Sequence, residues 1–314
     1  MTSPLKIIFA GTPEFSVYPL KKLLQSEHQV IAVYTQPDRP AGRGRHLKPS
    51  PVKELALEHG IEVFQPLNFK QEEDLSQLEA LQADLMIVVA YGLILPQRVL
   101  DAPRYGCMNI HASLLPRWRG AAPIQRAIQS GDSQTGVTIM QMEAGLDTGP
   151  MLVIEALDIG ERETGGQLHD RLAPLGADAL MVALEKLQAG ELQPQPQDDN
   201  LANYAHKLDK KEAQIDWTES SRQIDRMVRA FNPWPVAFTH LDGNSMRVWE
   251  TRLTQETSEA APGTIVAADS QGICVATGDN DLLITTLQPA GKRAMAAADF
   301  VNAHDVAGKC FANA

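Results

Sequence analysis

The chain has 314 residues, of which 44% are hydrophobic and 21% are charged, and its formal net charge is −11. A single hydrophobic core stops growing at about 250–300 residues, so this length predicts two domains. The composition is that of a globular protein. The acidic charge excludes a protein that holds nucleic acid or an anionic membrane through its overall field, so any polyanionic partner would have to bind a local basic patch.

Cysteine usage and the N-terminus predict the compartment. Cys107, Cys274 and Cys310 are far apart and include no Cys-x-x-Cys pair, which predicts reduced thiols without a disulfide frame or a zinc site. The apolar run at residues 7–10 is too short for the core of a signal peptide or for a membrane span. We therefore expect a cytoplasmic protein.

The N-terminal part of the chain alternates between strand and helix patterns. An apolar run at 5–10, leucines at helical spacing over 20–24 and a β-rich run at 30–34 predict a strand–helix–strand unit. The turn after the first strand, Gly11–Phe15, lacks the further glycines of a dinucleotide loop, so Gly11 is interpreted as a residue that turns the chain. The most apolar run, at 84–90, predicts a central strand buried on both faces.

A basic segment follows the second predicted strand. Residues 35–53 contain four prolines and two glycines, which predicts an irregular loop. Its one acidic side chain is Asp38. Its basic side chains are Arg39, Arg43, Arg45, Lys48 and Lys53. Two interpretations stay open, a solvated mobile loop and a contact with nucleic acid or phosphate.

Asn109 and His111 lie two residues apart in a predicted strand at 107–111, so their side chains leave the same face. An amide beside an imidazole at a strand end suits the stabilisation of an oxyanion. A structural histidine before a turn is the plainer interpretation, and the pair alone does not decide. Asp147 lies between Gly145 and Gly149, where it is either a turn aspartate bonded to its own backbone or a carboxylate that orients a histidine.

The Gln- and Pro-rich segment at 190–206 predicts a linker between two domains. Residues 1–189 are expected to form a Rossmann-like α/β domain with a mostly parallel sheet. In residues 207–314, five short β-patterned runs between 237 and 287 predict a small β-barrel similar to the oligonucleotide/oligosaccharide-binding (OB) fold. This architecture does not by itself establish nucleic-acid binding.

The pattern Asn-x-His-x-Ser-Leu-Leu-Pro at 109–116, followed downstream by Asp147-Thr-Gly, resembles the folate-dependent formyltransferases. The closer resemblance is to the branch of this family that formylates methionyl-tRNA, and it covers essentially the whole chain. The segments that carry it are 9–13, 35–44, 89–96, 116–123, 231–235 and 287–291.

The resemblance implies that the formyl group of 10-formyltetrahydrofolate passes to the α-amine of methionine on initiator tRNA, which leaves tetrahydrofolate. Asn109 and His111 would stabilise the tetrahedral oxyanion, while Asp147 would tune His111 and assist proton transfer. No metal is implied. Arg43 would contact the tRNA. The segment that would bound the cofactor consists of Ser113, Leu114, Leu115 and Pro116.

Two alternatives remain. The same chemical residues could formylate an amino-sugar nucleotide or a glycinamide ribonucleotide, although the basic loop and the second domain argue against both. The chain could instead bind tRNA or folate without catalysis, although the complete set of Asn109, His111 and Asp147 argues against that. A monomer without membrane contact is expected.

Overall fold

The computed structural model describes residues 3–41 and 46–312 of the chain. The chain forms two compact units. Unit 1 comprises Met1–Gly120, Gln134–Asp158 and His169–Tyr204, and unit 2 comprises Ala121–Ser133, Ile159–Leu168 and Ala205–Ala314. No helix in the described part of the chain is long and apolar enough to cross a membrane.

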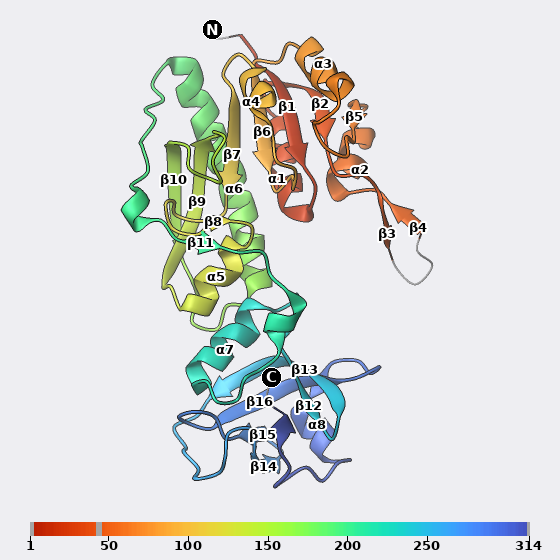
Figure 1. Ribbon diagram of the computed structural model, residues 1–314, viewed down its shortest axis with the longest axis vertical. Coiled ribbons are helices and arrows are strands. Elements are labelled where there is room, and N and C mark those ends of the chain that lie inside the picture. Colours follow the sequence, from red (N-terminus) through yellow and green to blue (C-terminus); the bar gives the residue numbers. More distant parts are fainter. Residues whose placement is uncertain (1–2, 42–45, 313–314) are drawn as a thin grey trace. The chain divides into compact units, whose positions relative to one another are not determined.

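Unit 1 is built on a seven-stranded sheet with the order β10-β9-β7-β6-β1-β2-β5 (Figure 1). Its strands are β1 (Lys6–Gly11), β2 (Gln29–Tyr34), β5 (Val63–Phe64), β6 (Leu85–Val89), β7 (Cys107–His111), β9 (Gln134–Gln141) and β10 (Met151–Asp158). Neighbours from β5 to β7 are parallel, whereas β9 is antiparallel to both β7 and β10. The Rossmann-like, mostly parallel sheet predicted from the sequence is confirmed.

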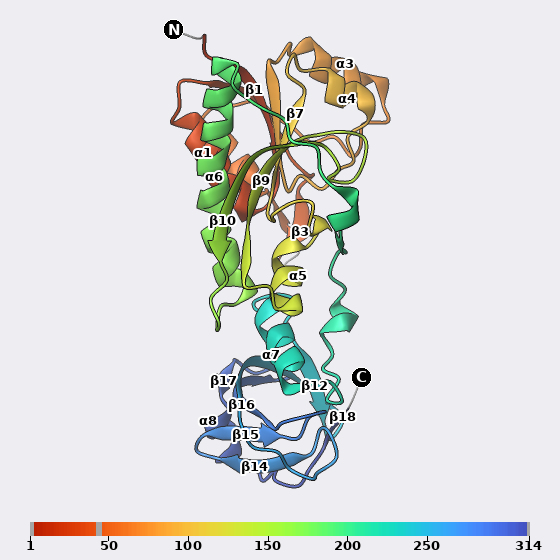
Figure 2. The same cartoon turned by 90° about the vertical axis from the view of Figure 1, so that its left-hand side faces the viewer.

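Helices cover both faces of this sheet. They are α1 (Glu14–Leu24), α2 (Pro51–Glu58), α3 (Glu72–Ala80), α4 (Gln97–Asp101) and the part of α6 (Gly165–Ala189) that belongs to unit 1. In Figure 2, α1 and α6 lie on one face, and α3 and α4 lie on the other. Alternate strand residues such as Ile8 and Met86 share one core with Leu78 of α3 and Val99 of α4, as the two-residue period of a strand requires.

The segment 35–53, predicted to be irregular, contains two short strands, so that prediction is wrong in part. β3 (Arg39–Ala41) and β4 (His46–Lys48) pair as an antiparallel hairpin, with Pro40 opposite Leu47. A two-stranded hairpin consists entirely of edges, so a proline can occupy it without breaking a ladder on both sides. The segment then ends in α2, whose first turn is capped by the Ser50 side chain accepting from the Lys53 N–H at 3.1 Å.

Unit 2 contains an antiparallel sheet with the order β14-β15-β16-β13-β12-β18, and β17 pairs with β16. The strands are β12 (Phe238–Leu241), β13 (Asn244–Leu253), β14 (Ile265–Asp269), β15 (Gly272–Val275), β16 (Leu282–Pro289), β17 (Met295–Ala296) and β18 (Phe311–Ala312), and the helices are α5 (Pro123–Ser130), α7 (Ser221–Ala230) and α8 (Ala297–Val301). Trp217 stacks on Phe311 in its core, with ring centroids 5.4 Å apart. This curled antiparallel sheet is consistent with the predicted small barrel.

Short elements occupy the segments between the larger ones. They are the 3₁₀ helices η1 (Asp199–Leu201) and η2 (Lys210–Ala213), and the strands β8 (Arg119–Gly120) and β11 (Tyr204–Ala205), which pair with each other. Residues 190–204, which the sequence predicts to belong to a linker, pack with unit 1. The domain boundaries predicted above stay a prediction.

Candidate functional site

Three parallel strands of unit 1 end at the same edge of the sheet, at Gly11, Val89 and His111. In open α/β sheets, ligands bind outside the carboxyl ends of the strands. Gly11 is needed there for close packing, because a Cβ at this position would lie 2.7 Å from the Cβ of Ser16. Ser16 donates a buried hydrogen bond of 2.6 Å to the carbonyl of Val89, which ties the start of α1 to the end of β6.

Asn109 and His111 are the third and last residues of β7. In the ladder with β9, Asn109 lies opposite Met140 and His111 opposite Thr138. The imidazole is almost fully buried, with 6% of its side chain exposed. Both side chains therefore leave one face of the strand at the edge where parallel strands end, as their two-residue spacing predicts.

Asp147 meets these two side chains from the loop between β9 and β10. Its Oδ2 lies 3.6 Å from His111 Nδ1, and its Oδ1 accepts from Asn109 Nδ2 at 3.5 Å. Its Oδ2 also accepts from the Gly120 N–H at 2.7 Å. The carboxylate thus receives hydrogen bonds from other segments of the chain and faces the histidine, which favours the orienting interpretation over the turn interpretation.

The histidine ring has a defined orientation. Nε2 lies 2.8 Å from the carbonyl oxygen of Trp118. A carbonyl oxygen can only accept, so Nε2 must carry hydrogen and donate. The other nitrogen, Nδ1, is the one that faces Asp147.

The segment predicted to bound the cofactor holds itself together through buried hydrogen bonds. Ser113 donates from its hydroxyl to the carbonyl of Arg117 at 2.6 Å, and the Leu115 N–H donates to Thr138 Oγ1 at 3.2 Å. Ser113 and Leu115 are buried, whereas Leu114 and Pro116 are half-buried. Leu114 and Pro116 are therefore the side chains of this segment that a ligand could reach.

Arg43, predicted to contact tRNA, lies outside the described residues. The hairpin that leads to it is anchored at its base, where Lys53 Nζ donates to Asp38 Oδ2 and to Gln65 Oε1, both at 2.7 Å. Gln65 Nε2 also donates to Asp38 Oδ1 at 2.8 Å. The hydrogen bonds from Lys53 and Gln65 lower the pKa of Asp38 below its ordinary value.

Two groups near the site were not found from the sequence. Arg119 is 2% exposed, and its Nε donates to Gln197 Oε1 at 3.0 Å. Gln197 Nε2 donates to the carbonyls of Asp147 and Gly149 at 2.8 and 2.7 Å. Gln197 lies in the Gln- and Pro-rich segment, whose composition carries no signal that one glutamine contacts a loop fifty residues away.

A pocket of about 740 Å³ lies in unit 2 among α5, α7 and β13. None of the site residues described above lines it. Two of its arginines are paired with one buried carboxylate, since Arg162 and Arg229 bond Asp225 at 2.9 and 2.8 Å. The remaining arginines of its lining are Arg222, Arg226 and Arg252. Within the described residues, no group of three or more His, Cys, Asp or Glu side chains could hold a metal ion.

Two family models match the chain over most of its length. The model described as formyl transferase matches residues 5–184, and the model described as formyl transferase, C-terminal domain, matches residues 207–305. The chain belongs to the formyl transferase family. Asn109, His111 and Asp147, together with the supporting residues Arg119 and Gln197, lie within or just beyond the first matched region.

Two relatives agree with this family. The chain is 58% identical to "Methionyl-tRNA formyltransferase" of Hydrogenovibrio crunogenus, covering 98% of this chain and 99% of the relative. It is 57% identical to the protein of the same name from Hahella chejuensis, covering 96% and 95%.

Two solved structures share the fold at low sequence identity. HypX from Aquifex aeolicus, in complex with tetrahydrofolic acid, has 18% identity and a TM-score of 0.65, covering 95% of this chain and 47% of HypX. An N-formyltransferase from Helicobacter canadensis has 17% identity and a TM-score of 0.68, covering 91% and 99%.

Proposed function

We propose that this formyltransferase transfers the formyl group of 10-formyltetrahydrofolate to the α-amine of methionyl-initiator tRNA. The observation that carries the proposal is the near-full-length identity of 57–58% with relatives named for that activity. N-formylmethionyl-tRNA for translation initiation is the product, and tetrahydrofolate is released. The enzyme acts in the cytoplasm and as a monomer.

The proposed chemistry follows from the geometry of the three polar side chains. The bound folate supplies the formyl carbon, which the neutral α-amine attacks. A C–N bond forms to the amine and gives a tetrahedral intermediate, and the bond between the formyl carbon and the folate nitrogen breaks when that intermediate collapses. Asn109 Nδ2 donates toward the formyl oxygen as it gains negative charge, and His111, protonated at Nδ1, adds a charge-assisted donor.

Proton transfer completes the step. The amine loses one proton, and the folate nitrogen gains one when it leaves. His111 is suited to this exchange because Nε2 is committed to Trp118, so only Nδ1 changes its protonation. Asp147, whose Oδ2 is 3.6 Å from Nδ1, orients the ring and assists the proton transfer.

The residues around the site fit a flat, partly apolar cofactor. Ile94, in the turn after β6, is 94% exposed, and Leu146, beside Asp147, is 61% exposed. Large apolar side chains in contact with water in loops suit a ligand surface, because a bound ring would remove that area from water. We place the folate against these two side chains and against Leu114 and Pro116 of the segment 113–116, with Ser113 and Leu115 holding that segment in place.

The tRNA would be held through its phosphates. Arg43 and the other basic side chains of residues 39–53 are the proposed contact with its acceptor end. Because the whole chain carries a net charge of −11, this local patch must supply the attraction.

The test is incubation of the purified protein with Met-tRNA and 10-formyltetrahydrofolate, followed by detection of formylmethionine and of tetrahydrofolate. Parallel reactions contain an amino-sugar nucleotide or a glycinamide ribonucleotide as the amine. We expect formylation of Met-tRNA alone. Formylation of either small amine in preference to Met-tRNA would contradict the proposed substrate. Absence of turnover with all three amines would contradict the proposed activity.

A further inference from the structure

The main chain of the loop that contains Asp147 is hydrogen-bonded by one side chain from another segment, Gln197. Asp147 has a positive φ of 53°, a left-handed conformation that aspartate tolerates better than most residues. The Gln197 amide nitrogen donates to the carbonyls of Asp147 and of Gly149, at 2.8 and 2.7 Å. The side-chain amide of Gln197 therefore bonds the main chain on both sides of Thr148.

Arg119 determines the orientation of the Gln197 side-chain amide. Its Nε donates to Gln197 Oε1 at 3.0 Å. Arginine has no acceptor, so the glutamine oxygen must face Arg119 and the amide nitrogen must face the two carbonyls. The arginine is held at its other end by Asp199, whose Oδ1 lies 2.7 Å from Nη2. Burial lowers the pKa of Arg119, but its hydrogen bonds to Asp199 and Tyr204 outweigh this and raise the pKa above its ordinary value.

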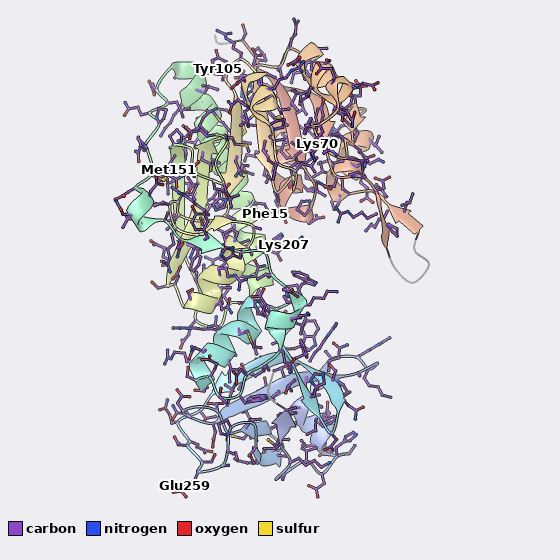
Figure 3. All side chains as sticks on the ribbon, viewed as in Figure 1. Phe15, Lys70, Tyr105, Met151, Lys207 and Glu259 are labelled. Atoms are coloured by element: carbon purple, nitrogen blue, oxygen red, sulfur yellow. The ribbon has the colours of Figure 1, made fainter. Side chains whose placement is uncertain are left out.

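The same short segment also reaches the carboxylate of Asp147. Gly120, the residue after Arg119, donates its N–H to Asp147 Oδ2 at 2.7 Å. Asp147 is thus fixed twice from β8, through its side chain by Gly120 and through its main chain by the Arg119–Gln197 pair. The segment of Gln197 is itself attached to the sheet, because Gln195 and Met151 form a reciprocal pair of main-chain hydrogen bonds, both of 2.8 Å (Met151 is labelled in Figure 3).

We propose that Gln197 is a positioning residue for formyl transfer, acting through the main chain at residues 147–149 to hold the Asp147 carboxylate against His111 Nδ1. Arg119 acts through Gln197. This inference rests on the proposed function.

The expected loss of activity follows from the distance between His111 and Asp147. His111 Nδ1 and Asp147 Oδ2 are already 3.6 Å apart, at the outer limit of a useful contact between these groups. Displacements of about 1 Å at a catalytic group cost about 10²-fold in rate. Gln197→Met keeps the length of the side chain and removes all three of its hydrogen bonds. We expect kcat to fall by about 10–100-fold while KM for tRNA stays unchanged.

Two further variants separate positioning from loss of folding. Gln197→Glu keeps the acceptor for Arg119 but aims oxygen at two carbonyls, so it should lose the same activity as Gln197→Met while staying folded. The matched control is Gln195→Met, in the same segment, where the side chain is exposed. Gln195→Met should have wild-type kcat. Thermal unfolding and circular dichroism of all three variants verify that they are folded.

The deciding experiment is a double-mutant cycle with Asp147→Ala, measured by single-turnover formylation. If Gln197 acts through Asp147, Gln197→Met should change the rate by less than about twofold in the Asp147→Ala background. A loss of the full 10–100-fold in that background, or wild-type kcat in folded Gln197→Met, would overturn the inference. Failure of the proposed function is seen separately, as absence of formylation by the wild-type enzyme.

Discussion

Replacing His111 by glutamine separates the two things that its ring does. Nε2 holds the carbonyl of Trp118 at 2.8 Å, and Nδ1 faces Asp147 at 3.6 Å. The amide nitrogen of glutamine reaches about the position of Nε2, so it can still donate to Trp118. It has no atom that takes up a proton. His111→Ala, in contrast, removes both contacts.

The two variants should differ in stability and agree in catalysis. The bond to Trp118 is made by a side chain that is only 6% exposed. Leaving a buried polar group unpaired costs about 1–3 kcal/mol, so His111→Ala should unfold with a free energy lower by about that amount than His111→Gln. At about 2–4 °C per kcal/mol, the melting temperature should be lower by at least 2 °C. Both variants lose the protonated Nδ1 of His111 as a charged donor. We therefore expect kcat to fall by about 10²–10⁴ in each variant.

The assay is formylation of Met-tRNA at saturating 10-formyltetrahydrofolate, with thermal unfolding of the same preparations. His111→Gln with turnover near that of the wild type would refute the role of protonated Nδ1. Equal melting temperatures for the two variants would refute the assignment of Nε2 as the structural nitrogen.

Three other outcomes are expected. Gly149→Ala should lose formylation while unit 2 stays folded, because its Cβ would lie 1.9 Å from the Gln141 carbonyl and displace the Asp147 loop; unchanged kcat would contradict this. Arg43→Ala should weaken catalysis on tRNA and leave folate binding intact, and tRNA affinity should fall steeply with salt; a flat salt response would exclude phosphate contacts. Alkylation at pH 8 should label exposed Cys310 and spare Cys107, because burial raises the pKa of Cys107 to about 12 and leaves about one thiolate in ten thousand; mass spectrometry locates the label.

Local patterns were sufficient for most elements of the fold. The strand predicted at 107–111 is β7, Cys107–His111, and the buried run at 84–90 contains β6, Leu85–Val89. In unit 2, β12 and β15 lie within the stretch between 237 and 287 where β-patterned runs are predicted. These predictions work because the alternation of buried side chains and the turn residues are properties of neighbouring residues.

Composition misled the prediction where a segment with little to bury nevertheless makes precise polar contacts. The proline-rich segment 35–53 forms the β3–β4 hairpin, whose base is held by Lys53 and Asp38. The Gln- and Pro-rich segment contains Gln197, which bonds the loop of Asp147. Hydrogen bonds of this kind join residues 15 and 50 positions apart, and no periodicity of the sequence predicts them.

By itself, the sequence determined that Asn109 and His111 leave one face of a strand, because side chains two apart in a strand must do so. Only the tertiary structure decided that Asp147 joins them, and that Nδ1 rather than Nε2 of His111 is the nitrogen free to exchange a proton. Both outcomes depend on contacts with Gly120 and Trp118. Those contacts exist only after separate loops have been placed at the edge of the sheet.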